Sequence, residues 1–285
     1  MQRTDFRCFH RLRVRWAEVD MQKIVFNAHY LMYIDTAMMD YWRALALPYE
    51  ASMVALGGDI YVKKATLEYH ASAQLEDLLD IGLRCARVGN SSLLLQAGIF
   101  RGEQLLVSGE LVYVFADPAT QTSRPVPEAL RAIFAAYEAG DAMAHAHCGA
   151  WDALGPDAAR VRHAVFIQEQ GIPADIEVDE LDATAVHVVL RNRLGMPVAT
   201  GRLLQHAPGE GRIGRMAVER ALRGGGWGRQ VLRALEDAAR ARGDQRVLLH
   251  AQVQARAFYE RAGYRIHGEP WMEAGIPHIT MQRAL

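Results

Sequence analysis

A run of glycines between an expected strand and an expected helix is the part of this sequence best suited to binding a ligand. The run reads RGGGWG over residues 223–228 and lies between a strand expected over 211–218 and a helix expected over 226–242. Glycines let a backbone approach a ligand closely, and a helix N-terminus behind them offers unpaired N–H groups and a positive dipole, which suits phosphate. The sequence lacks the Gly-Lys-Ser/Thr ending of a nucleotide P-loop and the later acidic residue of a dinucleotide fold. The alternative is a glycine-rich loop without a ligand.

A pair of carboxylates forms a second candidate site. Glu18 and Asp20 follow the first expected strand, and a helix expected over 27–45 begins shortly after them. A carboxylate at such a junction can act as a nucleophile or general base, and the first N–H groups of the helix can polarise a carbonyl. These two parts suffice to hydrolyse a thioester. The alternative is that Asp20 only caps a turn.

Metal and disulfide chemistry find little support in the sequence. His145, His147 and Cys148 lie close together, but no fourth ligand follows at a zinc-like spacing, so we expect no metal. We interpret residues 141–150 as a flexible linker instead. The three cysteines are far apart in the sequence and make no disulfide framework.

Length and composition limit the class of protein. A chain of 285 residues suggests two domains, and 51% hydrophobic with 23% charged residues is ordinary globular composition. A net charge of -1 gives no support for nucleic-acid binding. No apolar run is long enough for a transmembrane helix, and the N-terminus lacks a secretory signal. We therefore expect a cytoplasmic protein without a membrane partner.

Two different patterns of elements would position these groups. In the first half, apolar residues at helical spacing predict a largely buried helix over 27–45 with Asn27 as its N-cap. Period-two patterns and turn residues predict strands over 61–69, 78–88, 92–101 and 104–116, and a helix over 127–138. A central helix packed on a twisted antiparallel sheet is the simplest arrangement.

The second half alternates helices and strands, which predicts a mixed α/β domain. The expected helices span 156–170, 226–242 and 252–262, and the expected strands 185–192, 197–205, 211–218, 246–250, 264–269 and 278–283.

Two segments of the second half resemble the motifs of GNAT-type N-acetyltransferases. In IGRMAVERALRGGGWG, residues 213–228, a strand is followed by Arg223, Gly226 and Gly228, which fill the family pattern Arg/Gln-x-x-Gly-x-Gly/Ala. AQVQARAFYERAGY, residues 251–264, is similar to the second family motif, with Gln252 where Asn is common. VFIQEQGIP, DELD, His187, LHAQ and EAGIPH are similar to a small bacterial subgroup of acetyltransferases.

This resemblance implies a GNAT fold over 151–285 that uses acetyl-CoA, with CoA as product, and an unidentified amine as acceptor. The backbone near Met216 and Val218 would bind the pantetheine arm. The amides of residues 223–229 would bind the pyrophosphate, a set that includes Arg223, Gly224, Gly226, Gly228 and Arg229. Tyr259 falls on the family tyrosine that protonates the leaving thiolate, and a phenol near the sulfur can do so. The general base for the amine remains open among Glu169, Glu177, Asp179, His187 and His278.

Residues 15–33, RWAEVDMQKIVFNAHYLMY, resemble the hot-dog-fold acyl-CoA thioesterases of the 4-hydroxybenzoyl-CoA thioesterase type. Asp20 falls on the catalytic acid, Asn27 on the residue whose N–H polarises the thioester, and Tyr30 on an early aromatic of the helix. Lys23 replaces a frequent glycine, and Asn27 stands where many members have His or an aromatic residue. GNSSLLLQ and VFADPATQTSRPVPEALR are further matches, and the resemblance implies a hot-dog domain over 1–140 that forms a homodimer or homotetramer. Lys63 and Lys64 would then meet CoA phosphates or lie on an exposed strand edge.

These resemblances predict a fusion of an acyl-CoA thioesterase with an acetyltransferase. In one alternative, only one domain is catalytic and the other binds CoA esters or drives oligomerisation. In another, the second domain transfers an acyl group longer than acetyl.

Overall fold

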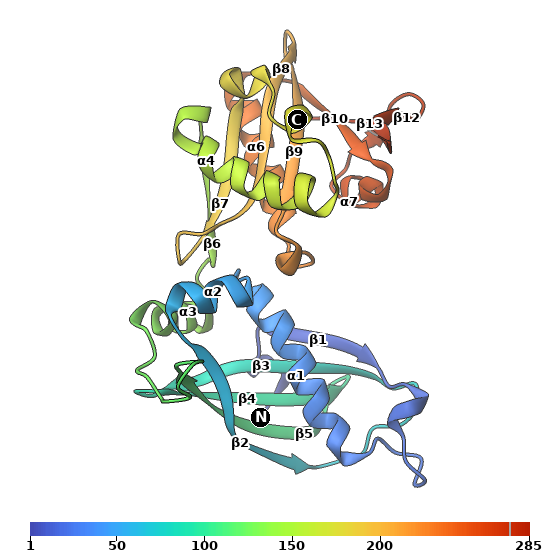
Figure 1. Ribbon diagram of the computed structural model, residues 1–285. Coiled ribbons are helices and arrows are strands. Elements are labelled where there is room, and N and C mark those ends of the chain that lie inside the picture. Colours follow the sequence, from blue (N-terminus) through green and yellow to red (C-terminus); the bar gives the residue numbers. More distant parts are fainter. Residues whose placement is uncertain (274) are drawn as a thin grey trace. The chain divides into compact units, whose positions relative to one another are not determined.

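The computed structural model describes residues 1–273 and 275–285 and divides into two compact units, Met1–Met143 and Ala144–Leu285 (Figure 1). Each unit has its own sheet. The mixed α/β architecture expected from the sequence, a helix on an antiparallel sheet followed by alternating helices and strands, is confirmed.

The first unit is an antiparallel sheet of five strands in the order β1-β3-β4-β5-β2. Its strands are β1 (Cys8–Arg13), β2 (Asp59–Tyr69), β3 (Leu78–Val88), β4 (Ser92–Arg101) and β5 (Gln104–Ala116). Tight hairpins join β3 to β4 and β4 to β5. The helices are α1 (Asn27–Ala44), α2 (Tyr49–Leu56) and α3 (Glu128–Ala139), with short 3-10 turns η1 (Arg3–Asp5) and η2 (Trp16–Glu18).

Helix α1 lies across one face of this sheet (Figure 1). Its buried side chains recur at helical spacing and are Tyr30, Tyr33, Ile34, Ala37, Met38, Tyr41 and Trp42. The opposite side of the helix exposes Met32 and Met39, so the helix is buried along a stripe rather than on all sides. Asn27 was expected to be the N-cap, but Phe26 occupies that position with extended backbone, and Asn27 is the first helical residue.

The second unit is built on an eight-stranded sheet. The strands follow the order β11-β13-β10-β9-β8-β7-β6, and β12 pairs with β13. They are β6 (Ala144–Gly149), β7 (Val186–Asn192), β8 (Pro197–Ala207), β9 (Glu210–Val218), β10 (Arg246–Gln252), β11 (Arg265–Ile266), β12 (Trp271–Glu273) and β13 (Ile276–Ala284). All neighbouring pairs are antiparallel except β9 with β10, which run parallel.

Helices cover both faces of this second sheet. On one face, Leu154 and Ala158 of α4 (Trp151–Arg162) pack on Val189 of β7. On the other face, α6 (Trp227–Arg242) packs on the neighbouring residues Val188 and Leu190, which point away from Val189 because strand side chains alternate. The remaining elements are the π-helical η3 (His163–Glu169), α5 (Ala174–Glu177), α7 (Arg256–Arg261) and the 3-10 turns η4 (Glu180–Thr184), η5 (Arg220–Leu222) and η6 (Val253–Ala255).

Two expectations about the start of the second unit are wrong. Most of the expected linker over 141–150 is strand β6, which pairs with β7 at the edge of the sheet. The helix expected to begin at residue 156 begins at Trp151, and Pro156 lies inside it. Packing of Trp151 and Leu154 against β7 stabilises a first turn that Pro156 alone would not favour.

No helix in the described parts of the chain is both long enough and apolar enough to cross a membrane.

Candidate functional site

The central feature of the second unit is an opening between its two parallel strands. β9 and β10 pair from Glu210 and Arg246 to Ile213 and Leu249, and both strands continue beyond that last pair. A cavity of about 560 Å³ lies there, and it is lined by residues 212–218 of β9 and 249–252 of β10. The backbone groups of β9 that face the opening are available to a ligand, because a strand edge without a partner presents its N–H and C=O groups.

The glycine loop begins beside this opening. Gly224 and Gly226 have φ of +89° and +87°, a region that L-residues with side chains rarely adopt, and Gly226 is the N-cap of α6. At Gly228 a Cβ would lie 3.4 Å from Val218 Cγ2, an ordinary van der Waals contact, so packing does not require glycine there. The amides of Gly225 and Arg229 donate within the loop, to Leu222 O and Gly226 O.

The remaining loop amides are candidate hydrogen-bond donors to a bound anion. In the described chain, no hydrogen-bond acceptor is found for the amides of Gly224, Gly226 and Gly228. They therefore form the core of the candidate phosphate site at the start of α6.

Several residues expected from the sequence line this one cavity. They are Met216, Val218, Arg223, Gly228 and Tyr259. Gly224 and Gly226 lie in the adjoining loop, whereas Arg229 lines a different groove, of about 450 Å³, along α6. Arg223 is not free for a ligand phosphate, since its guanidinium bonds Glu169 through two contacts of 2.6 and 2.7 Å.

Tyr259 brings a phenol to the wall of the cavity. It lies on α7 with 9% of its surface exposed, and its hydroxyl donates to the Met216 sulfur at 3.7 Å. Burial raises the pKa of Tyr259 to about 12, so the phenol remains protonated at neutral pH. The rings of Phe258 and Tyr264 pack edge-on against it and fix its orientation.

Three of the five candidate bases are carboxylates already engaged by arginines. Glu169 pairs with Arg223, and hydrogen bonds from that guanidinium hold its pKa below the usual range. Glu177 accepts from Arg162 at 2.5 Å and is almost fully buried. Asp179 receives two bonds from Arg202, of 2.6 and 2.7 Å, which hold its pKa low.

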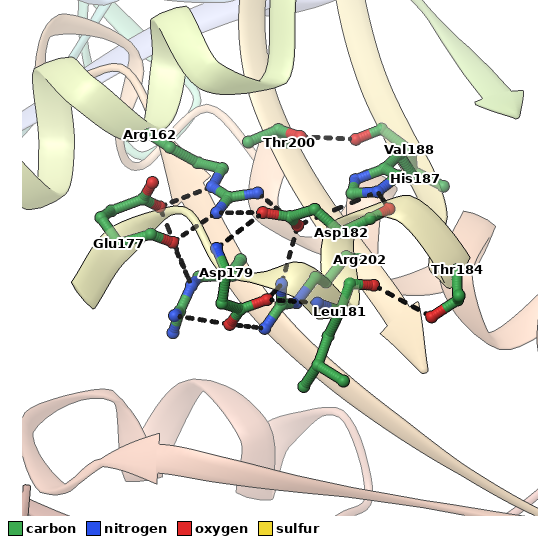
Figure 2. A network of polar contacts seen from close by, with 11 residues as sticks. Arg162, Glu177, Asp179, Leu181, Asp182, Thr184, His187, Val188, Thr200 and Arg202 are labelled. Carbon is green, nitrogen blue, oxygen red and sulfur yellow. Dashed lines mark hydrogen bonds and ion pairs between the residues drawn. The ribbon is translucent and has the colours of Figure 1, made fainter. Parts of the chain in front are cut away.

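Glu177 and Asp179 belong to a buried ionic network (Figure 2). Its charged members are Arg162, Glu177, Asp179, Asp182, Arg202 and Arg215. Three arginines match three carboxylates, so the cluster is neutral as a whole. We interpret it as the structural wall of the cavity, because Glu177, Asp179, Arg202 and Arg215 also line it.

The two histidines among the candidate general bases differ in their surroundings. His187 is 1% exposed, its Nε2 lies 2.9 Å from the Asp182 carbonyl, and burial lowers its pKa. It does not line the cavity, so its role is structural. His278 does line the cavity, and its Nδ1 lies 2.9 Å from the Ile276 carbonyl. A carbonyl can only accept, so Nδ1 carries the proton in the neutral ring and Nε2 keeps a lone pair.

The candidate site of the first unit is a tight loop before α1. The Asp20 amide donates to Ile24 O at 2.9 Å, and Asp20 Oδ1 accepts from the Gln22 amide at 2.8 Å. In the single chain, half-buried Asp20 thus caps the turn. Lys23 has φ of +63°, a backbone conformation that glycine adopts easily, which explains why glycine is frequent at this position. This conformation costs a lysine about 1–2 kcal/mol.

The other residues of this loop divide into structural and exposed ones. Glu18 is buried and accepts from the Arg15 amide and from the Tyr33 hydroxyl, both at 2.8 Å. Burial alone would raise its pKa, but its bonds to Arg15 and Tyr33 lower it overall. Tyr30 is also structural, because its buried hydroxyl accepts from the Ala73 amide at 2.9 Å. Asn27 is exposed, and its amide lies in the first turn of α1, where helical N–H groups have no partner within the helix.

Lys63 and Lys64 are both exposed on β2, which is an edge strand with a bulge between Val62 and Lys64. Among the described residues, no group of three or more His, Cys, Asp or Glu side chains is placed to hold a metal ion.

Sequence reasoning missed part of the cavity wall. Arg212 and His250 line it, as does Gln252, which was named only as a departure from a family motif and which donates to Gln170 at 2.9 Å. The available signal was the presence of polar residues within otherwise apolar strands, Arg212 and Arg215 in β9 and His250 and Gln252 in β10.

Comparison with known proteins assigns each half to a family. Residues 156–285 match the model of the acetyltransferase (GNAT) domain, and residues 14–134 match the thioesterase-like superfamily. The protein named uncharacterized N-acetyltransferase YjcF of Bacillus subtilis (strain 168) is 39% identical over 128 residues, which are 45% of this chain and 90% of that protein. This chain belongs to the GNAT acetyltransferases and carries a hot-dog, thioesterase-like domain ahead of the GNAT domain.

Solved structures similar to each half are also known. An acyl-CoA N-acyltransferase from Pseudomonas aeruginosa is 35% identical, with 50% of this chain and 99% of that chain covered and a TM-score of 0.45. A thioesterase from Thermus thermophilus, solved with coenzyme A and Zn, is 24% identical, with 48% and 98% covered and a TM-score of 0.43.

Proposed function

We propose that the second domain, which we place at 151–285, transfers the acetyl group of acetyl-CoA to an amine in the opening between β9 and β10. The observation that carries this proposal is the opening itself, with the Tyr259 hydroxyl 3.7 Å from Met216 on its wall. The pantetheine arm would extend along Met216 and Val218. The pyrophosphate would accept from the free amides of Gly224, Gly226 and Gly228.

In this proposal the amine nitrogen attacks the thioester carbon and the C–S bond breaks. The amine loses one proton to His278 Nε2, directly or through one water, because the other candidate bases are engaged. The CoA sulfur leaves with the bonding electron pair, and the Tyr259 hydroxyl donates toward it. The products are the acetylated amine and free CoA.

For the first domain, which we place at 1–140, we propose hydrolysis of an acyl-CoA thioester. Asp20 would activate water or attack the carbonyl, and the Asn27 amide would polarise it. Both groups belong to the loop and first turn that precede the body of α1. The exposed α1 side chains Met32 and Met39 support a homodimer or homotetramer built through this domain.

A second candidate function is that only the acetyltransferase domain is catalytic. The turn-capping bond of Asp20 favours this alternative, because it occupies one of the two carboxylate oxygens. The first domain would then bind CoA esters or hold copies of the chain together.

One assay separates these functions. Free CoA is measured from a panel of acyl-CoA thioesters, each with and without spermidine, glucosamine, L-lysine and tryptamine. Release without an amine supports hydrolysis, and amine-dependent release of CoA from acetyl-CoA, with the acetylated product seen by mass spectrometry, supports transfer. Transfer from longer thioesters and not from acetyl-CoA would replace acetyl with a larger acyl group.

A further inference from the structure

One arginine of the cavity wall has no counterion among the described residues. Arg212 of β9 is half-buried and lines the cavity, and among the described residues its side chain makes no hydrogen bond or ion pair. The other arginines of the wall are paired: Arg202 and Arg215 belong to the ionic network, and Arg223 binds Glu169. A partly buried guanidinium without a partner is unfavourable unless water or a ligand supplies acceptors.

Arg212 lies on the face of the sheet opposite to Tyr259. Ile213, Leu249 and Ile279 pack in the same core as Tyr259. Because strand side chains alternate, the neighbours of these residues, Arg212, His250 and His278, point to the other face. Tyr259 would thus approach the thioester from one side, and this second face is where an acceptor would enter.

The space beside Arg212 is open. Gly214 is two residues along β9, pairs with Arg202 of β8, and lines the cavity. A Cβ built on Gly214 would meet no atom within 4 Å. This glycine therefore leaves room for a ligand next to the Arg212 side chain.

The surroundings of Arg212 favour an anion. His250 lies near Arg212, His278 and His206. Burial lowers the pKa of His250, and the positive charge of Arg212 lowers it further. The ring of His250 packs on Trp271, which in turn packs on His278. Glu273 is the acidic side chain of this cluster, and it is exposed on β12. The cluster thus offers the permanent positive charge of Arg212 and the imidazole N–H of His250, whereas its one carboxylate, Glu273, lies on an exposed residue.

We propose that this cluster, with Arg212 at its centre, binds an anionic group on the acceptor, so that the preferred acceptor is an amine that also carries a carboxylate or a phosphate. This inference rests on the proposed acetyl transfer and names the class of its acceptor. A guanidinium binds either anion through two parallel N–H bonds, which would orient the amine toward His278. Loss of a hydrogen bond to a charged group lowers affinity by about 10- to 100-fold.

Matched pairs of amines test this proposal. L-lysine and 1,5-diaminopentane differ by a carboxylate, and O-phosphoethanolamine and ethanolamine differ by a phosphate. The wild-type protein is expected to show a kcat/KM at least about 10-fold higher for the anionic member of one pair, and the pair that shows it identifies the anion. In Arg212→Gln this preference disappears through a higher KM for the anionic amine, while rates with the amine that lacks the anion and the KM for acetyl-CoA stay unchanged.

Two variants serve as controls. Arg212→Lys keeps the charge without the forked geometry and should retain part of the preference. Arg233→Gln removes an arginine of the separate groove along α6 and should change nothing. A wild-type protein without preference in either pair, or an Arg212→Gln protein that loses activity equally with both members of a pair, would overturn the assignment of Arg212. Failure of the wild-type protein to acetylate any amine would instead refute acetyl transfer itself, and this inference with it.

Discussion

Replacing Tyr259 by phenylalanine removes one oxygen from the proposed site and leaves the ring packing in place. The hydroxyl is buried, and its partner is the Met216 sulfur rather than a strong acceptor, so its loss has little structural cost. We therefore expect the variant to fold normally and to bind acetyl-CoA with unchanged affinity. The hydroxyl would act where charge builds on sulfur in the transition state, so the effect should fall on kcat.

The size of this effect follows from the acidity of the phenol. The pKa of Tyr259 is raised to about 12 by burial, whereas a thiol ordinarily has a pKa near ~8.5. Full proton transfer to the thiolate is then uphill, and the phenol contributes mainly a hydrogen bond to a charged group. Such a bond accelerates the step by about 10- to 100-fold, less than the upper range for complete acid catalysis of about 10⁴-fold.

Steady-state kinetics with an accepted amine measure this directly. Tyr264→Phe is the matched control, because Tyr264 lies in the same core and its hydroxyl donates to Glu236 at 3.0 Å, away from the cavity lining. The control should keep normal turnover and lose about 1.5–3 kcal/mol of stability, because its hydroxyl bonds a carboxylate. If Tyr259→Phe retained normal kcat while chemistry was rate-limiting, Tyr259 would be a packing residue and the reasoning would be refuted.

Four further predictions follow from the two units. Asp20→Asn should lower thioester hydrolysis at least about 10²-fold, measured as CoA release without amine, and unchanged release would remove Asp20 from the mechanism. Gly226→Val should mainly raise the KM for acetyl-CoA, because φ of +87° is unfavourable for a branched residue; an unchanged KM would count against the phosphate site. His278→Gln should lower amine acetylation by about 10²-fold or more, with partial rescue by added imidazole; an unaltered rate would exclude His278 as the base. Asp182→Asn should destabilise the second unit by about 3–5 kcal/mol at pH 7, measured by urea unfolding. Burial would raise the pKa of Asp182, but its bonds to Arg162 and Arg202 lower that pKa overall. The stabilisation by Asp182 is therefore present above the ordinary carboxyl pKa and is lost as the pH falls through the pKa of Asp182 in the folded protein. Equal stability of variant and wild type at pH 7 would contradict this.

The sequence predicted most of the regular elements because their apolar residues repeat at the period of a helix or a strand. The strands β3, β4 and β5 and the helices α1 and α6 lie within a few residues of their expected bounds. β6 was missed for a physical reason: as an edge strand it exposes most of its side chains, and AHAHCG alternates only Ala and Cys with His, without the β-branched or large apolar residues that mark a strand. The early start of α4 depends on contacts with β7, which are distant in the sequence.

The candidate site could be predicted only in part. Local motifs identified Tyr259 and the glycine loop, because each requires a particular residue at a fixed position. They did not separate His278 from Glu177 and Asp179, since that distinction depends on Arg162 and Arg202, which reach these carboxylates from other elements. By residue type alone Glu18 and Asp20 form an acidic pair, and only the thioesterase resemblance singled out Asp20. In the structure, Arg15 and Tyr33 engage Glu18.

The most direct test of the account is a crystal structure of the full chain with CoA. The account predicts that the pantetheine arm lies between β9 and β10, with the sulfur near the Tyr259 hydroxyl and the pyrophosphate on the amides of Gly224, Gly226 and Gly228. CoA in the second unit but outside this opening, or a closed opening with Tyr259 turned away from the sulfur, would contradict it.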